Sequence, residues 1–174
     1  MKKSQPCLAI GCSVFLLSTL LLVNYLAAKD QRGGNDKYAC SEPNPATMCN
    51  ASNTCGSASA PCTVDVKRTA YSAAAIPSIP KSKGNALFCV KVGTTITWKS
   101  TSKNTGFVVD FGPSSPFEPA RAIIGGSDRP VSVVAKKEGC YKYSAGACVS
   151  GAISGMCGSA NAEAIVTGSG ASQQ

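Results

Sequence analysis

Cysteines are the residues of this 174-residue chain with the clearest capacity for chemistry, and the chain has 10 of them. Cys7 and Cys12 lie in or beside an apolar N-terminal segment, and eight more follow it: Cys40, Cys49, Cys55, Cys62, Cys89, Cys140, Cys148 and Cys157. An even number of cysteines in a small chain with an export segment indicates a disulfide framework. The alternative is a metal site, but the chain has neither a Cys-x-x-Cys spacing nor a histidine, and zinc or iron–sulfur sites ordinarily show one of them. We therefore predict disulfides, with a connectivity that eight cysteines leave open.

Other catalytic constellations are missing from the sequence. A Ser/His/Asp arrangement cannot form without histidine, and no pair of carboxylates has a suggestive spacing. Gly125-Gly126 lacks the lysine and the helix that a phosphate-binding loop needs. We expect no enzyme, no catalytic residue, no cofactor and no metal.

The apolar N-terminal segment is the strongest signal for localisation. No charged residue lies between Ser4 and Ala28, and Lys2 and Lys3 precede this stretch. A helix of that length approaches the ~30 Å hydrocarbon core of a bilayer, and the basic start predicts that the rest of the chain is exported. Two interpretations stay open: a retained anchor, with the main domain on the periplasmic or extracellular side, or a signal peptide that is cleaved after residues 1–28. The apolar run is long for a signal peptide, which favours the anchor.

The chain is basic, with a formal charge of +8, and 15 basic against 9 acidic residues remain once Lys2 and Lys3 are set aside. The basic residues are scattered in pairs at most and do not interleave with aromatic side chains. Because nucleic-acid-binding surfaces combine a basic stripe with stacking residues, we expect no nucleic-acid partner. A mildly basic, solvated surface explains the charge.

Residues 29–62 form a segment rich in Gly, Ser, Asn, Pro and Ala, with four cysteines. Such a composition buries too little apolar surface to fold by hydrophobicity alone. The cysteines either close it into a small stapled knot or pin it against the following domain. In both cases we expect a Cys-rich, flexible spacer between membrane and domain.

From Thr63 onward the sequence changes to short runs rich in Val, Thr and aromatic residues, separated by Gly and Pro. The predicted strands are 63–66, 86–92, 94–98, 107–111, 131–135, 140–143 and 162–166. No later window shows a helical repeat of apolar residues. The pattern predicts an all-β, antiparallel sandwich or barrel over residues 63–168, followed by a disordered tail at 169–174.

Four motifs in this region resemble a known family. They are Val90-Lys91-Val92-Gly93-Thr94-Thr95-Ile96-Thr97-Trp98, then Phe107-x-Val-Asp-Phe111 with Ser-Pro-Phe117, then Gly139-x-Tyr-x-Tyr143, and finally Ala164-Ile165-Val166. In this order they are similar to the cupredoxin-like sandwich, which implies a Greek-key β-sandwich. The family's type 1 copper site needs two histidines and a cysteine. This chain has no histidine, so the resemblance implies a frame without its copper centre.

The loop after Tyr143 holds Cys148 and Met156, in the region where the family places copper ligands. Cys148 and Cys157 bracket a loop rich in Gly, Ser and Ala, and we predict a disulfide that closes it. The alternative is a Cu(I) site of cysteine and methionine sulfur, which soft-ligand chemistry permits.

Two further features stand out as packing or docking candidates. Trp98, the only tryptophan, is predicted to pack in the core or at its rim. Phe117, Arg121, Ile123 and Ile124 lie in what we predict to be a Gly/Pro-rich loop. These apolar residues are either anchors tucked onto the sandwich or a docking patch for a protein partner.

Together these observations predict an exported, membrane-tethered, non-catalytic binding or structural module. We expect it to act as an accessory subunit of a membrane or envelope complex, with protein partners. The alternative is a periplasmic redox or Cu(I)-handling protein that uses Cys and Met ligands.

Overall fold

The computed structural model describes residues 38–57, 59–117, 120, 122–150 and 157–168. The apolar segment 1–28, the first part of the predicted spacer and the tail 169–174 lie outside the described residues. Within the described ranges, no helix is long and apolar enough to cross a bilayer.

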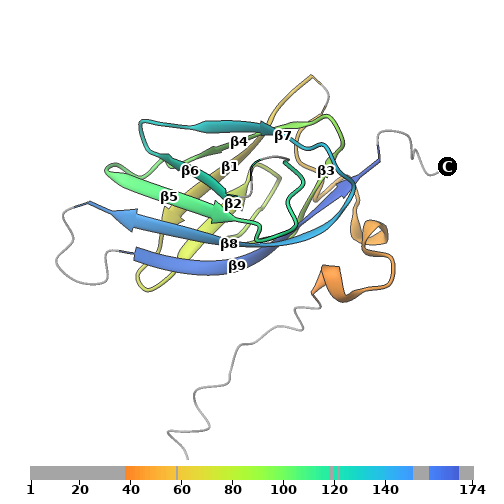
Figure 1. The fold of residues 1–174 in the computed structure, drawn as a ribbon, viewed down its shortest axis with the longest axis horizontal. Helices are drawn as coiled ribbons and strands as arrows, with labels where there is room; N and C mark the ends of the chain where they lie inside the picture. The colour runs from red at the N-terminus through yellow and green to blue at the C-terminus, as the bar shows by residue number, and fades with distance from the viewer. Residues whose placement is uncertain (1–37, 58, 118–119, 121, 151–156, 169–174) are drawn as a thin grey trace, which may run out of the picture. The chain divides into compact units, whose positions relative to one another are not determined.

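Nine strands make up about half of the described chain (Figure 1). They are β1 Cys62–Arg68, β2 Ala73–Pro77, β3 Phe88–Lys91, β4 Thr95–Lys99, β5 Thr105–Asp110, β6 Ala122–Gly126, β7 Val131–Val134, β8 Gly139–Val149 and β9 Cys157–Thr167. A four-stranded sheet has the order β2-β1-β4-β7, and a five-stranded sheet has the order β3-β9-β8-β5-β6. The chain is therefore predominantly β and built from two sheets, as its sequence predicts.

Both sheets are mixed, so the prediction of a purely antiparallel sandwich is wrong in this respect. β1 pairs with β4 in parallel and β3 pairs with β9 in parallel, whereas the other neighbours are antiparallel. The turn at Gly93, with φ +90°, takes the chain from β3 in one sheet to β4 in the other. Only glycine adopts this backbone conformation without strain, which explains its place between two strands that pair with different partners.

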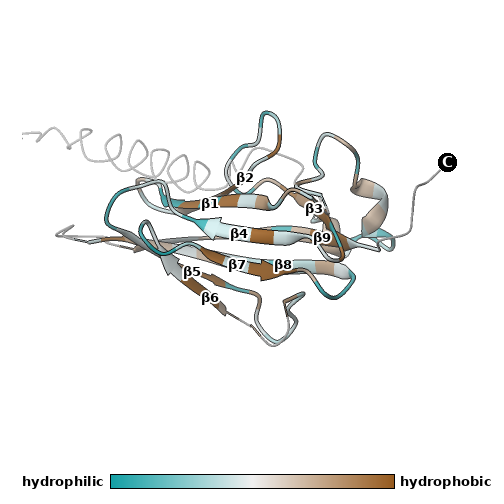
Figure 2. Ribbon diagram, turned by 90° about the horizontal axis from the view of Figure 1, so that it is seen from above, coloured by the Kyte–Doolittle hydropathy of each residue, from teal (hydrophilic) through white to brown (hydrophobic). Residues whose placement is uncertain are grey.

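A single large core lies between the two sheets. Along most strands buried and less buried residues alternate, as in Val64 and Val66 of β1 or Phe107 and Val109 of β5, and Figure 2 shows apolar segments alternating with polar ones along the ribbon. The Trp98 indole is fully buried at the centre. Its ring centroid lies 5.6 Å from that of Tyr143 and 6.5 Å from that of Phe88, both edge-on. Trp98 of one sheet thus packs against aromatic rings of the other sheet. Each such aromatic pair stabilises the fold by ~0.5–1.5 kcal/mol in addition to the burial of its apolar area.

Strands β2 and β6 were not predicted from the sequence. β2 consists largely of alanine, which has little preference for strands, and it is held by antiparallel pairing with β1. The prediction of a loop at residues 122–126 is wrong, because these residues form β6 and pair with β5. Two glycines suggest a loop, but a Cβ at Gly125 would clash with the Phe107 ring. The glycine is there to let an aromatic ring pack against the strand.

The segment before β1 is docked on the sandwich. It contains two 3₁₀ helices, η1 Ala39–Ser41 and η2 Pro45–Met48, which lie beside β8 and β9 (Figure 1). Ala39, Cys89 and Ile165 form a second small core there, on the outward side of the five-stranded sheet. Of the two alternatives for the Cys-rich segment, its described part therefore adopts the pinned arrangement.

The same segment covers the free edge of β3. The Cys89 N–H donates to the Asn53 carbonyl at 2.9 Å, and the Cys55 N–H donates to the Cys89 carbonyl at 2.8 Å. An unpaired strand edge is a template for association with other chains. Residues 53–55 therefore cap an edge that would otherwise be open.

Candidate functional site

The eight cysteines beyond the N-terminal segment form four disulfides. The pairs are Cys40–Cys140, Cys49–Cys89, Cys55–Cys62 and Cys148–Cys157. The prediction of a disulfide framework is confirmed. Four disulfides in a chain of this size indicate an oxidising compartment outside the cytosol.

The cysteine on which a soft-metal site would depend is engaged in one of these bonds. Cys148 of β8 lies directly opposite Cys157 of β9, with 4.0 Å between their Cα atoms. In this state neither sulfur is a thiolate, the form that binds metals. Met156 lies outside the described residues, and the described part of the chain contains no cluster of three or more His, Cys, Asp or Glu side chains able to hold a metal ion.

The residues proposed as a docking loop do not share one environment. Phe117 is buried, with its ring 5.1 Å from the Phe111 ring, and Ile123 is buried in the core from β6. Ile124 points the other way and is 67% exposed. Arg121 lies outside the described residues. Phe117 and Ile123 are therefore anchors of the sandwich, and Ile124 is the one described member of the set that a partner could touch.

A pocket of about 510 Å³ on the five-stranded sheet gathers more polar groups than the predicted loop does. The sequence did not single it out. Its lining comprises residues of three adjacent strands, β5, β8 and β9, two residues that follow β5, and one residue of the docked segment: Tyr38, Asp110, Phe111, Gly112, Lys142, Tyr143, Ser144, Asn161, Ala162 and Glu163.

Strand register explains why these polar side chains converge. Asp110 of β5 pairs with Ser144 of β8, and Ser144 pairs with Asn161 of β9, so the three form a row across the sheet. Lys142 and Glu163 form the next cross-strand pair. Side chains directly opposite each other on antiparallel strands have Cβ atoms ~4.5–5.5 Å apart. Five hydrogen-bonding side chains are thereby fixed in one patch.

Glu163 is the unusual member of this patch. Its side chain is only 9% exposed, and among the described residues Oε1 has no hydrogen-bond partner. Oε2 accepts one long hydrogen bond, 3.4 Å, from the N–H of Cys40. A carboxylate offers about four acceptor positions, so this buried group is under-satisfied, and burying a polar atom without a partner is costly.

The lysine opposite Glu163 does not neutralise it in the described structure. The Lys142 Nζ lies 5.3 Å from the centroid of the Tyr38 ring, in a cation–π contact. Tyr38 itself is 59% exposed and forms a wall of the pocket. The site thus pairs an aromatic face that already holds an ammonium group with a carboxylate that lacks one.

The position of Tyr38 over the five-stranded sheet depends on the Cys40–Cys140 bond. Tyr38 lies two residues before Cys40, and Cys140 lies two residues before Lys142 on the same outward face of β8. The disulfide therefore brings the tyrosine over the sheet. A sequence signal existed in the polar residues at alternate positions of β8 and β9, but the partner of Cys40 could not be read from it.

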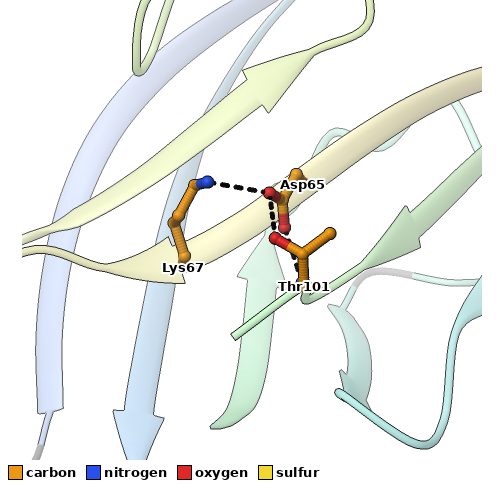
Figure 3. A network of polar contacts seen from close by, with 3 residues as sticks. All are labelled: Asp65, Lys67 and Thr101. Carbon is orange, nitrogen blue, oxygen red and sulfur yellow. Dashed lines mark hydrogen bonds and ion pairs between the residues drawn. The ribbon is translucent and has the colours of Figure 1, made fainter. Parts of the chain in front are cut away.

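A second polar cluster, on the four-stranded sheet, is structural. Asp65 accepts hydrogen bonds from the Thr101 N–H at 2.9 Å and the Thr101 hydroxyl at 2.7 Å, and the Lys67 Nζ lies 3.1 Å from it (Figure 3). Burial alone would raise the pKa of Asp65, but the hydrogen bonds from Thr101 and the charge of Lys67 outweigh it and lower the pKa. Both carboxylate oxygens are engaged by local partners, so this cluster ties β1 to the end of β4.

Tyr143 lines the pocket but belongs to the core. Its ring packs against Trp98 and Phe111, and burial raises the pKa of its hydroxyl. The phenol therefore stays neutral across the physiological pH range. It provides apolar support beneath the polar patch.

Comparison with known proteins gives no relative. No family model, no curated protein and no solved structure matches this chain.

Proposed function

We propose that this chain is an exported, non-catalytic binding module, held at the membrane by its N-terminal segment, that serves as an accessory subunit of a membrane or envelope complex. One observation carries the proposal. All eight cysteines beyond residue 30 are in disulfides: three of the bonds join the segment before β1 to the sandwich, and the fourth joins β8 to β9. Stapling favours a rigid scaffold with a fixed surface, which suits binding.

We further propose a Greek-key, cupredoxin-like frame for the sandwich. The support is the order of the sequence motifs, together with two mixed sheets that share one core. Strands β3 and β4 carry the motif Val90–Trp98 on which the resemblance is strongest. Without a histidine, a frame of this kind cannot form the family's type 1 copper site. We therefore propose that the chain functions through a binding site on its surface.

Membrane tethering rests on the sequence alone. The uncharged segment from Ser4 to Ala28, behind Lys2 and Lys3, has the length and charge bias of an anchor. It places the sandwich on the periplasmic or extracellular side, where its disulfides are stable.

Redox or Cu(I) handling is the second candidate, and the disulfides weigh against it. It needs free thiols, and Cys148 is bonded to Cys157. Alkylation of the unreduced protein followed by mass spectrometry counts free thiols. Full labelling of Cys148 would favour the copper-handling function over the binding function.

The test of the proposed function uses native membranes. They are solubilised in mild detergent, the particles are sized, and the proteins that travel with the chain are identified by mass spectrometry. We expect a particle larger than the 17.7 kDa chain in its micelle, with defined partners and an intact N-terminal peptide. A chain that is soluble, alone and begins near residue 29 would refute the tethered accessory subunit.

A further inference from the structure

We propose that the pocket between Tyr38 and the β5–β8–β9 face binds a cationic group, the guanidinium or ammonium of an Arg or Lys side chain on a partner protein. The inference rests on the proposed binding function and names the chemistry of its site. The carboxylates of Asp110 and Glu163, the ring of Tyr38 and the acceptors Ser144 and Asn161 supply the recognition.

The buried Glu163 carboxylate lacks a compensating positive charge in the described structure. Glu163 is buried except for 9% of its surface, and within the described chain its Oε1 accepts no hydrogen bond. Oε1 itself is closed to solvent, so a ligand in the pocket does not reach this atom directly. A cationic group in the pocket instead compensates the charge of the carboxylate, an interaction that strengthens where water is largely excluded. A neutral ligand would leave that charge uncompensated.

The aromatic wall is the second argument. The Tyr38 ring already has an ammonium group near its face, that of Lys142 at 5.3 Å. This contact shows that the ring is presented to a cation in the free protein, and Arg occupies such positions more often than Lys. An incoming guanidinium can stack on Tyr38 and release Lys142 to solvent, since the Lys142 side chain is long and its residue is exposed.

Local charge is the third argument. The chain as a whole carries +8, but the pocket is lined by two carboxylates and one lysine. The overall positive charge repels basic partner surfaces, whereas the anionic pocket attracts a single cationic group. The volume of about 510 Å³ accommodates a side chain with part of its backbone.

The probes are two peptides that differ only in charge: acetyl-Gly-Arg-Gly-amide and the same peptide with citrulline in place of arginine. The full oxidised chain in detergent micelles is labelled with ¹⁵N and titrated with each peptide. We expect millimolar binding of the Arg peptide, with amide shifts clustered at Tyr38, Lys142 and Glu163. The citrulline peptide should bind at least about tenfold more weakly, because it lacks the charge.

Variants then assign the binding to the pocket. Glu163→Gln and Asp110→Asn remove a charge with little change of shape, and each should weaken binding of the Arg peptide by about tenfold. Asp128→Asn removes an exposed carboxylate on the β6–β7 turn and should leave binding unchanged. If Glu163→Gln fails to fold, Tyr38→Leu at an exposed position gives the same test.

Three outcomes would overturn the inference: equal binding of both peptides, shifts outside the pocket, or a shift at Tyr38 with neutral cellobiose but not with the Arg peptide. The last result would assign the pocket to a carbohydrate. None of these removes the proposed function if the chain still travels with partners from native membranes. Conversely, absence of partners there would refute the accessory function even if the Arg peptide binds.

Discussion

Replacing Cys40 and Cys140 together by serine removes the bond that holds Tyr38 over the sheet. The two residues are 100 apart in sequence. In the unfolded chain the Cys49–Cys89 bond provides a shorter path between them, which leaves an effective loop of about 60 residues. In the chain-entropy model a loop of that size stabilises the fold by roughly 4 kcal/mol at 25 °C.

The Cys148→Ser/Cys157→Ser double variant is the matched control. These residues are 9 apart, so the same model gives roughly 2.5 kcal/mol for their bond. We expect urea unfolding of the full chain in detergent to show both losses of free energy in this order. Thermal unfolding should give melting temperatures that are lower by roughly 12 °C and 8 °C. The sandwich should stay folded in both variants, because a domain of this size has ~5–15 kcal/mol of stability.

A smaller loss of unfolding free energy in the Cys40/Cys140 variant than in the control would refute this prediction. That result would mean that the docked segment is held by its apolar contacts, such as Ala39 against Ile165, and that the disulfide adds nothing. Both partners are replaced in each variant because a single free thiol could exchange with the other disulfides.

Three further predictions concern single positions. Gly158→Ala should destabilise the fold by about 1–3 kcal/mol, because its Cβ would meet the backbone of Ser72, whereas Gly106→Ala, where a Cβ has room, should change the urea midpoint little. Asp65→Asn should cost about 1 kcal/mol at pH 7, since the variant keeps the shape of the side chain but loses the charge that faces Lys67 at the protein surface. The pKa of Asp65 in the folded protein lies below the ordinary 3.8. The stabilisation is therefore present above pH 3.8 and is lost as the pH falls through the folded pKa. A difference in unfolding free energy between variant and parent that grows on acidification would contradict this. Trp98→Ala should cost about 3–5 kcal/mol by leaving a cavity in the core, and a smaller loss in urea unfolding would show that the core collapses around it.

The predictable part of the fold follows from local patterns. Thr95-Ile96-Thr97-Trp98 alternates in the sequence, and the structure buries Ile96 and Trp98 as that alternation demands. Seven of the nine strands overlap the predicted runs. β2 and β6 could not be predicted because alanines and glycines carry no strand preference of their own, and pairing with β1 and β5 decides their state.

The pocket could not be predicted because it depends on contacts far apart in sequence. Asp110, Ser144 and Asn161 become neighbours only through the register of β5, β8 and β9. Tyr38 joins them only through the pairing of Cys40 with Cys140, one of 105 pairings open to eight cysteines. The residues that the sequence did suggest for docking, Phe117 and Ile123, are apolar because the core needs them.

Crosslinking in living cells from a photoreactive phenylalanine at position 38 shows whether the pocket contacts a partner protein. The control is the same residue at position 71, where Tyr71 is 97% exposed on the turn between β1 and β2. We expect a membrane-associated adduct from position 38 with one defined protein, through a peptide that contains Arg or Lys, and none from position 71. No adduct from position 38, or the same adducts from both positions, would contradict it.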